Sequence, residues 1–240
     1  MKYMGSKRRI AKHIAPILND AIKKSNITKY IEPFVGGANM IQHIECENKY
    51  GLDSNEYLIA MWNALQSGWL PPESISKEEY VAIRDNKEAY SKELVAFTGF
   101  VTTYKSKWFG GYAGVGVEKN GKQRFYYDES KRNILKQLSE LKNIGFHLKD
   151  FRNIDQEKMR GCLVYCDPPY ESTTNYRDGF DHDVFWNFVR DISCYNLVYT
   201  SEYNAPDDFE SIWEGVVTTS LSKSIRKKDI EKLFIIGGQK

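Results

Sequence analysis

The stretch from residue 30 to residue 53 restricts the fold of this chain more than any other segment. The residues Tyr30–Phe34 are apolar enough for a short strand and run into Gly36-Gly37, after which a helix is expected near 38–47. The residues Tyr50–Asp53 then predict a second strand that ends on a carboxylate. A strand, a glycine turn, a helix and another strand with a terminal acid form the opening half of a doubly wound α/β fold.

Strands and helices also alternate in the rest of the chain. Ser6 can cap a first helix, whose apolar residues recur at helical spacing as far as Ile22. The last hundred or so residues predict a helix over about 183–192. The same part of the chain predicts strands at Phe146–Lys149, Cys162–Cys166, Asn196–Thr200 and Lys232–Ile236.

A long interruption separates these two parts. It contains helical stretches near 76–92 and 130–142, on either side of a segment rich in glycine and aromatic residues. We therefore predict an α/β protein with a doubly wound, Rossmann-like sheet formed by residues 1–59 and 146–240. The remaining residues, 60–145, are predicted to form an inserted and mainly helical domain.

Composition excludes some classes of protein and leaves others open. Lys and Arg number 34 against 32 Asp and Glu, so the net charge of +2 does not indicate a nucleic-acid partner. Basic residues gather at 1–24, 99–132 and 222–232, which fits either phosphate-binding patches or solvated helix faces. The four Cys and four His lack the spacing of a zinc site, so no metal is expected. No apolar run approaches the ~18 residues of a membrane span, and we expect a soluble cytoplasmic protein with no membrane partner.

The sequence VYCDPPYEST, residues 164–173, carries the strongest functional signal. Its two prolines have no N–H for a β-ladder and fix φ, so they end the preceding strand and stiffen the chain. The Asp167 side chain and the neighbouring carbonyls are then rigid acceptors for the two hydrogens of an amino group. Tyr170 offers a face for stacking a planar ring. As a turn alone D-P-P-Y is ordinary, but after an apolar strand it favours a site for the exocyclic amine of a nucleobase.

Gly36 and Asp53 together indicate a cofactor that contains adenosine. Small residues after a strand let a ligand approach the backbone. Asp53 follows Glu32 by 21 residues (53 − 32) and ends the next strand, where nucleotide-binding α/β folds place the carboxylate that binds ribose hydroxyls. Either feature alone is equally compatible with a plain turn or with a solvated acid.

Four segments, in this order along the chain, resemble the Dam-type alpha group of DNA adenine-N6 methyltransferases: KYMGSKRRIAKHI (2–14), IEPFVGGANM (31–40), GLDSN (51–55) and DPPY (167–170). The resemblance implies methyl transfer from S-adenosylmethionine to N6 of an adenine flipped out of duplex DNA, without a metal. It implies a cofactor site made by Tyr3, Lys7, Phe34, Gly36, Asp53 and Asp167. It also implies that the catalytic residues, which hold the base, are Asp167, Pro168, Pro169 and Tyr170.

The resemblance extends to the organisation of the chain. In this family the segment inserted before D-P-P-Y is the target-recognition domain, which matches the predicted insertion at 60–145. Double-stranded DNA is the implied partner, and we expect a monomer in the cytoplasm of a bacterial host or of a phage-infected cell. The sequence leaves open whether the enzyme belongs to a restriction–modification pair, a phage or a host regulator.

The inserted segment departs from the family in one respect. Many members that recognise GATC carry a hairpin resembling R-x-N-x-x-G-x-F-N-x-P, and residues 98–127 contain no such pattern, so GATC recognition is not implied. Cations and aromatic residues mix in this region as they do in loops that face DNA. The candidates for DNA contact are Lys105, Lys107, Trp108, Tyr112, Lys122 and Arg124. The aromatic side chains fit a small core of the insertion equally well. The polar segment 171–180 is expected to form a flap over the base site.

Three other functions remain open on the sequence. Enzymes that methylate an RNA base or a protein glutamine amide use related pockets, but they usually have Asn where this chain has Asp167. A catalytically silent DNA-binding relative is possible, although the intact D-P-P-Y argues against decay. A nucleotide-dependent oxidoreductase would be expected to show G-x-G-x-x-G, which the chain lacks.

Overall fold

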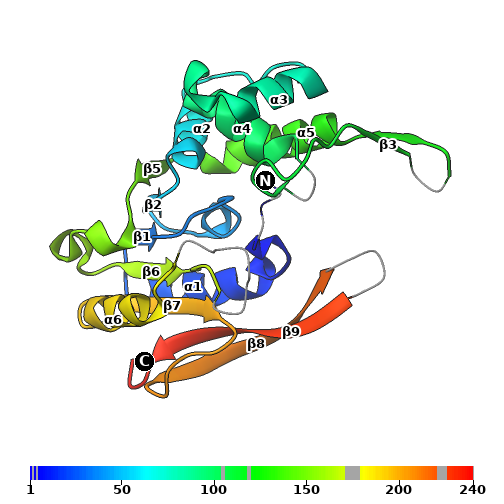
Figure 1. Cartoon of the computed structure of the whole chain (residues 1–240). Helices are drawn as coiled ribbons and strands as arrows, with labels where there is room; N and C mark the ends of the chain where they lie inside the picture. The colour runs from blue at the N-terminus through cyan, green and yellow to red at the C-terminus, as the bar shows by residue number, and fades with distance from the viewer. Residues whose placement is uncertain are drawn as a thin grey trace.

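A seven-stranded sheet forms the centre of the molecule (Figure 1). The computed structural model describes residues 1, 3, 5–103, 106–117, 120–170, 179–220 and 226–239. The strand order is β5-β2-β1-β6-β7-β9-β8, and the first five of these neighbours are parallel. The parallel strands are β1 (Lys29–Glu32), β2 (Asn48–Asp53), β5 (Ile144–Leu148), β6 (Leu163–Cys166) and β7 (Leu197–Glu202). The antiparallel strands are β8 (Phe209–Ser220) and β9 (Arg226–Ile236).

Strand β6 lies in the middle of this sheet, and every one of its residues is buried. Its side chains alternate between two hydrophobic cores: Leu163 and Tyr165 face one, while Val164 and Cys166 face the other. A strand buried on both faces has a continuous apolar sequence, as residues 162–166 do. The predicted α/β fold with a doubly wound sheet is confirmed.

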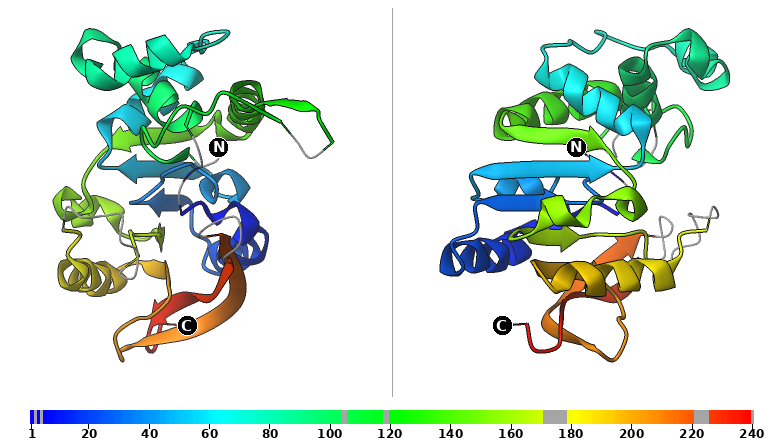
Figure 2. Two further views of the ribbon diagram at one scale, coloured as in Figure 1. Left: turned by 45° about the vertical axis from the view of Figure 1, so that its right-hand side comes forward. Right: turned by 90° about the vertical axis from the view of Figure 1, so that its left-hand side faces the viewer.

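Helices cover both faces of the sheet (Figure 2). The first core is closed by α1 (Ala11–Lys24) and α2 (Glu56–Gln66), and the second by α6 (His182–Ser193). The inserted segment contributes α3 (Lys77–Asp85), α4 (Lys92–Val101) and α5 (Tyr126–Leu138), whose apolar side chains join the first core. A hairpin of β3 (Val115–Val117) and β4 (Gln123–Phe125) projects from these helices (Figure 1). Within the described ranges, no helix has the length and apolar character needed to cross a bilayer.

The order of the strands determines where a ligand can bind. From β1 the chain moves outward to β2 and β5, and it then returns to form β6 and β7 on the other side of β1. The connections that leave β1 and β6 therefore diverge, and the carboxyl ends of two such strands are where open α/β sheets bind their ligands. The segments after β1 and after β6 are the Gly36 turn and the Asp167-Pro168-Pro169-Tyr170 sequence.

The helix predicted near 38–47 is wrong. The chain there forms a turn and a short 3₁₀ helix, η2 (Ile41–His43). Gly36 and Ala38 both have left-handed backbone, with φ of 47° and 52°, which a right-handed helix does not accept. Gln137 of α5 donates hydrogen bonds at 3.1 and 2.9 Å to the carbonyls of residues 37 and 38, and so satisfies groups that a helix would otherwise pair.

Other elements also differ from the sequence prediction. Helix α4 lies partly in the segment rich in glycine and aromatic residues, for which no helix was predicted, and β3, β4 and β8 were not predicted. In α4, a Cβ on Gly99 would lie 2.4 Å from the Trp108 ring, so the glycine that weakens the helix signal is required by packing. The 3₁₀ helix η1 (Lys7–Arg9) precedes α1, and Ser6 caps η1 rather than α1 itself.

Candidate active site

The turn after β1 is held by the aspartate at the end of β2. The Oδ2 atom of Asp53 accepts a hydrogen bond from the Gly36 backbone N–H at 3.0 Å, and Oδ1 accepts one from Asn55 N–H at 2.9 Å. Burial raises the pKa of Asp53 to about 6, although both hydrogen bonds oppose this shift. The two predicted cofactor residues Gly36 and Asp53 are therefore in direct contact.

Tyr3 lies against the same turn. A Cβ on Gly36 would be 3.0 Å from Tyr3 Cε1, and a Cβ on Gly37 would be 2.8 Å from Tyr3 Cβ and 2.6 Å from Asn39 Nδ2. Only glycine leaves room for the ring and the amide at these positions. The Asn39 Nδ2 group is buried and has no hydrogen-bond partner among the described residues. A buried unpaired donor beside a strand-end carboxylate fits a cofactor that carries both acceptor and hydroxyl groups.

Phe34, also predicted to bind the cofactor, comes directly before this turn. It is half-buried and packs against the second core, with ring centroids 5.4 Å from Phe151 and 5.7 Å from Phe185. The aromatic cluster fixes the direction in which the chain leaves β1. Phe34 therefore lies on the face of the sheet that α6 covers.

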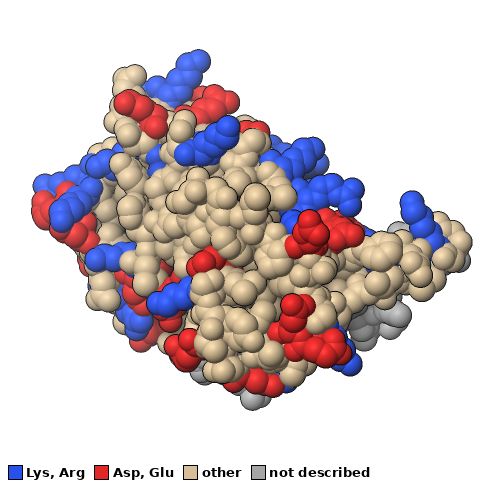
Figure 3. All heavy atoms as spheres, turned by 90° about the horizontal axis from the view of Figure 1, so that it is seen from above, with Lys and Arg blue, Asp and Glu red and all other residues tan. Residues whose placement is uncertain are grey.

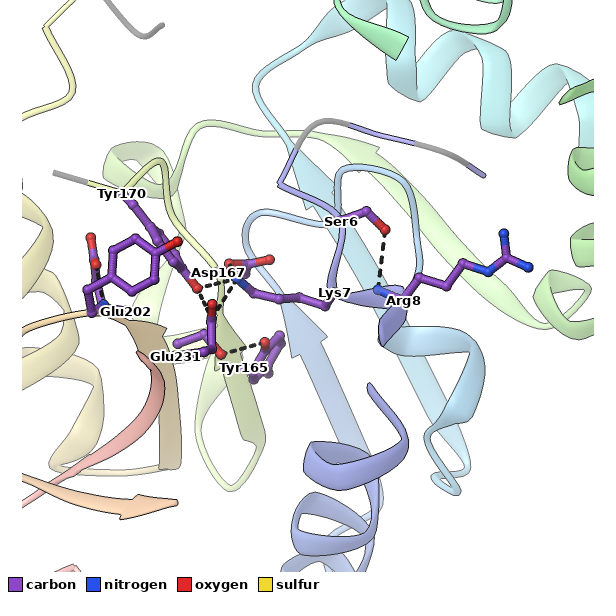
Figure 4. Close-up of polar contacts among 10 residues, drawn as sticks. Ser6, Lys7, Arg8, Tyr165, Asp167, Tyr170, Glu202 and Glu231 are labelled. Atoms are coloured by element: carbon purple, nitrogen blue, oxygen red, sulfur yellow. Dashed lines mark hydrogen bonds and ion pairs between the residues drawn. The ribbon is translucent and has the colours of Figure 1, made fainter. Parts of the chain in front are cut away.

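The end of β6 carries a buried cluster of charged and phenolic groups (Figure 4). The Lys7 ammonium lies 2.9 Å from Asp167 Oδ1 and 2.8 Å from Glu231 Oε1. It also donates to the Tyr170 hydroxyl and stands 4.1 Å from the centroid of that ring, while the hydroxyl donates to Glu231. Two carboxylates thus share one ammonium at the end of β6.

Burial and charge act in opposite directions within this cluster. Burial raises the pKa of Asp167 to about 6, and Glu231 adds to the rise, while Lys7 opposes it. Burial by itself would lower the pKa of Lys7, but Asp167 and Glu231 outweigh it and raise that pKa. Asp167 is therefore a carboxylate acceptor at neutral pH that takes up a proton in mildly acidic solution.

Pro168 and Pro169 hold Tyr170 beside the strand end. Pro168 is buried, and Pro169 and Tyr170 are partly buried. Tyr203 packs edge-on against Tyr170, with ring centroids 4.8 Å apart. The structure therefore brings together the four predicted catalytic residues, of which Asp167 is also a predicted cofactor residue, and a further predicted cofactor residue, Lys7.

Glu231 is the member of this cluster that the sequence did not reveal. It comes from β9 and is 4% exposed, yet in the sequence it stands among the basic residues of 222–232. Its position depends on the antiparallel pairing of β9 with β7 and β8, which places it opposite Gly215. In the sequence, Glu231 shows only as an acidic residue among basic ones, and this pattern does not identify its partner.

The candidates for DNA contact fall into two groups. Lys107 and Lys122 are exposed, and Arg124 donates to Glu129 at 2.7 Å. Trp108 and Tyr112 instead pack within the insertion: Trp108 lies 4.6 Å from the Phe100 ring, and the Tyr112 hydroxyl donates to the Ile75 carbonyl at 2.7 Å. On the face seen in Figure 3, basic and acidic side chains are interspersed, and a basic side chain lies near the end of the projecting hairpin. Lys105 and most of the predicted flap, residues 171–178, lie outside the described residues.

A sheet with five parallel strands, and with a glycine turn and an acidic-proline motif at its switch point, is the arrangement in which open α/β enzymes bind a ligand. A family model described as "D12 class N6 adenine-specific DNA methyltransferase" matches residues 3–189. The match covers more than half of the chain, which therefore belongs to this family and is an adenine-specific DNA methyltransferase. The resemblance found in the sequence is confirmed.

Two curated relatives are similar to this chain. The Type II methyltransferase M.MjaIII of Methanocaldococcus jannaschii is 28% identical, over 96% of this chain and 91% of the relative. The Type II methyltransferase M.FokI of Planomicrobium okeanokoites is 23% identical over 82% of this chain, and the match spans 33% of that longer protein. Among solved structures, an rRNA methyltransferase from Streptomyces viridochromogenes aligns with a TM-score of 0.43 and 9% identity, over 95% of this chain and 84% of its own.

Proposed function

We propose that the chain transfers the methyl group of S-adenosylmethionine to N6 of an adenine flipped out of a specific site in duplex DNA. The observation that carries this proposal is the placement of Asp167 at the end of β6, the strand that pairs in parallel with β1, which the glycine turn follows. A donor cofactor on one segment and an acceptor base on the other would meet at the switch point of the sheet.

Tyr3, Phe34, Gly36 and Asp53 would hold the cofactor, and Lys7 and Asp167 would complete its site at the end of β6. Asp53 keeps lone pairs beyond those used by its two backbone hydrogen bonds, and these can accept ribose hydroxyls. The unpaired Asn39 Nδ2 can donate to the methionyl carboxylate. S-adenosylmethionine supplies a methyl group already activated by its sulfonium, so the protein chiefly needs to align the two reactants.

Asp167 and Pro168 would orient the amino group of the base. The N6 lone pair of adenine is conjugated with the ring and is a poor nucleophile. Hydrogen bonds from N6 to the Asp167 carboxylate and the Pro168 carbonyl draw the nitrogen toward tetrahedral geometry and aim its lone pair at the methyl carbon. The C–N bond forms as the C–S bond breaks, and N6 loses one proton to Asp167 or to water.

Tyr170 would stack on the flipped adenine. Taking a base out of the duplex costs a few kcal/mol of lost stacking and pairing, part of which an aromatic face restores. The stiff Pro168-Pro169 pair and the edge contact with Tyr203 keep the Tyr170 ring beside the end of β6.

The inserted residues 60–145 would select the DNA target. The hairpin of β3 and β4 projects from the inserted helices and carries the exposed Lys122, while Lys107 is exposed nearby in the sequence. Exposed cations of this kind bind phosphates and make affinity depend on salt. The names of the two relatives support a place in a restriction–modification system, and we expect the enzyme to act as a cytoplasmic monomer.

Incubation with labelled S-adenosylmethionine tests this function. Unmethylated plasmid DNA should acquire label on adenine N6, and label found solely in RNA or protein would overturn the proposal. Sequencing the methylated bases in DNA from cells that express the chain should show one recurrent sequence. Methylation without any sequence preference would remove the role assigned to the inserted residues.

A further inference from the structure

Glu231 is a buried carboxylate that the reaction described above does not use. It is 4% exposed, accepts a hydrogen bond from the Tyr170 hydroxyl and lies 2.8 Å from the Lys7 ammonium. An ionised carboxylate is strongly destabilised by burial unless it is paired. Glu231 is paired with groups at the base site, so a role connected to that site is the first one to consider.

The Lys7 ammonium lies where the amino group of the base is expected. It contacts Asp167 Oδ1 at 2.9 Å and stands 4.1 Å from the centroid of the Tyr170 ring, which are the two groups proposed to hold adenine. An ammonium and an adenine amino group are both N–H donors, and they compete for the same carboxylate oxygen. Lys7 must therefore yield this position when the base enters.

Resting on the function proposed above, we propose that Glu231 is a positioning residue that takes over the Lys7 ammonium as the base engages Asp167. The ammonium already touches both carboxylates, and the flexible lysine stem allows a small shift toward Glu231. Its charge stays paired throughout and does not enter a buried position alone. Glu231 also keeps its hydrogen bond from the Tyr170 hydroxyl, which holds the stacking ring in place.

Substitution of Glu231 by an uncharged residue should keep the Lys7 ammonium on Asp167. In Glu231→Gln, Asp167 is the remaining carboxylate of the pair that holds Lys7, so the ammonium stays on the oxygen that the base requires. Binding of the flipped base is weakened, while the turn that carries Gly36 and Asp53 is unchanged. We expect the KM for unmethylated plasmid DNA to rise about tenfold, the size of one charge-assisted hydrogen bond, with a smaller change in kcat. Affinity for S-adenosylmethionine, measured by calorimetry, should remain within about twofold of the wild-type value, because the turn that carries Gly36 and its hydrogen bond to Asp53 are intact.

The pH dependence of kcat/KM gives a second readout. It would not change if Glu231 only stabilised the fold. Burial and then Glu231 raise the pKa of Asp167, so loss of the Glu231 charge should shift the acidic limb of kcat/KM to lower pH. The ionisable groups that face Asp167 come from four elements of the fold. They are Lys7 of η1, Glu32 of β1, Tyr165 and Cys166 of β6 with Tyr170 beyond it, and Glu231 of β9.

Two further variants complete the experiment. Glu231→Asp keeps the charge and should restore part of the lost DNA affinity. Glu214→Gln makes the same chemical change on β8, where Glu214 is half-exposed and lies 3.5 Å from Lys232, and it should leave KM and the pH profile unchanged. Thermal unfolding of each variant shows whether the fold is intact.

Separate outcomes distinguish this proposal from the function on which it rests. A wild-type protein that labels no adenine overturns the function itself. A wild-type protein that methylates adenine, together with a folded Glu231→Gln variant whose KM and acidic limb are unchanged, overturns the role of Glu231 alone. A raised KM with an unmoved acidic limb would also overturn it, because it would mean that Glu231 does not act through Asp167.

Discussion

The carboxyl ends of β2 and β6 each carry a partly buried aspartate, and the two differ in their neighbours. Asp53 accepts backbone hydrogen bonds from Gly36 in the turn after β1 and from Asn55 in its own turn, whereas Asp167 faces the Lys7 ammonium and the Glu231 carboxylate. Burial raises the pKa of each to about 6. Equivalent positions on one parallel sheet thus serve two purposes: Asp53 is fixed by the backbone, and Asp167 belongs to a charged cluster that can rearrange.

The largest expected effect is that of a substitution at Asp167, the aspartate in the charged cluster. Asp167→Asn should lower the rate of methyl transfer about 10²–10⁴-fold, because the amide loses the negative charge that orients N6 and can take up its proton. Single-turnover transfer of labelled methyl to DNA measures this rate, and circular dichroism checks the fold. A rate within threefold of wild type would show that Asp167 does not touch the reacting amine.

A dependence of stability on pH should follow from both aspartates. Their pKa is 3.8 ordinarily and about 6 in the folded protein, so the folded state binds protons more tightly than the unfolded chain. Tighter proton binding by the folded state raises the free energy of unfolding by up to about 3 kcal/mol per carboxyl. This contribution is fully present below about pH 4 and is lost as the pH rises through about 6.

Urea unfolding between pH 4 and pH 7 measures this loss as a fall in the unfolding midpoint. Asp53→Asn should make the fall shallower, because it removes one of the two titrating groups. If the midpoint falls as steeply in this variant as in the wild type, Asp53 does not titrate between pH 4 and pH 7. The two aspartates would then differ in pKa.

Cofactor affinity separates the two aspartates further. Asp53→Asn should weaken binding of S-adenosylmethionine about tenfold, because the amide offers one acceptor oxygen where the carboxylate offers two. Calorimetry measures the affinity, and transfer at saturating cofactor should be close to wild type. Unchanged affinity would exclude Asp53 from the ribose site.

The smallest effect is expected at the projecting hairpin, far from either aspartate. Lys122→Ala should reduce DNA affinity about two- to threefold and lower the salt dependence of binding, as the loss of a single phosphate contact does. Fluorescence anisotropy with labelled duplex DNA at two salt concentrations measures both quantities. Lys23→Ala, which removes an exposed cation near the end of α1, should change neither. Equal effects of the two substitutions would show that the hairpin makes no special contact with DNA.

The parts of the site that the sequence predicted are those defined by neighbouring residues. Gly36, Asp53 and Asp167 each stand directly after an apolar run, and a strand followed by a turn is a local pattern. Glu231 was missed because its position arises from the pairing of β9 with β7, which no local pattern encodes. Trp108 and Tyr112 illustrate the same limit, since cations and aromatic residues in a loop look alike whether they pack inward or face a ligand.

The errors in secondary structure have the same origin. Ala38, Met40 and Gln42 favour a helix after Gly36, but Gln137 binds the carbonyls of residues 37 and 38 from a helix a hundred positions away. In α4, Gly99 lowers the helical propensity, and the ring of Trp108 fills the space that it leaves. In both places tertiary contacts outweigh local preference.

The ion cluster joins segments that are 224 positions apart in the sequence (231 − 7). Contacts between such distant segments form late, because the intervening chain must first be ordered. A nascent chain on the ribosome can complete β1, β2 and β6 before residue 231 has emerged. It would then hold Asp167 and Lys7 without Glu231, so the ion cluster at the candidate active site is complete only after β9 has been synthesised.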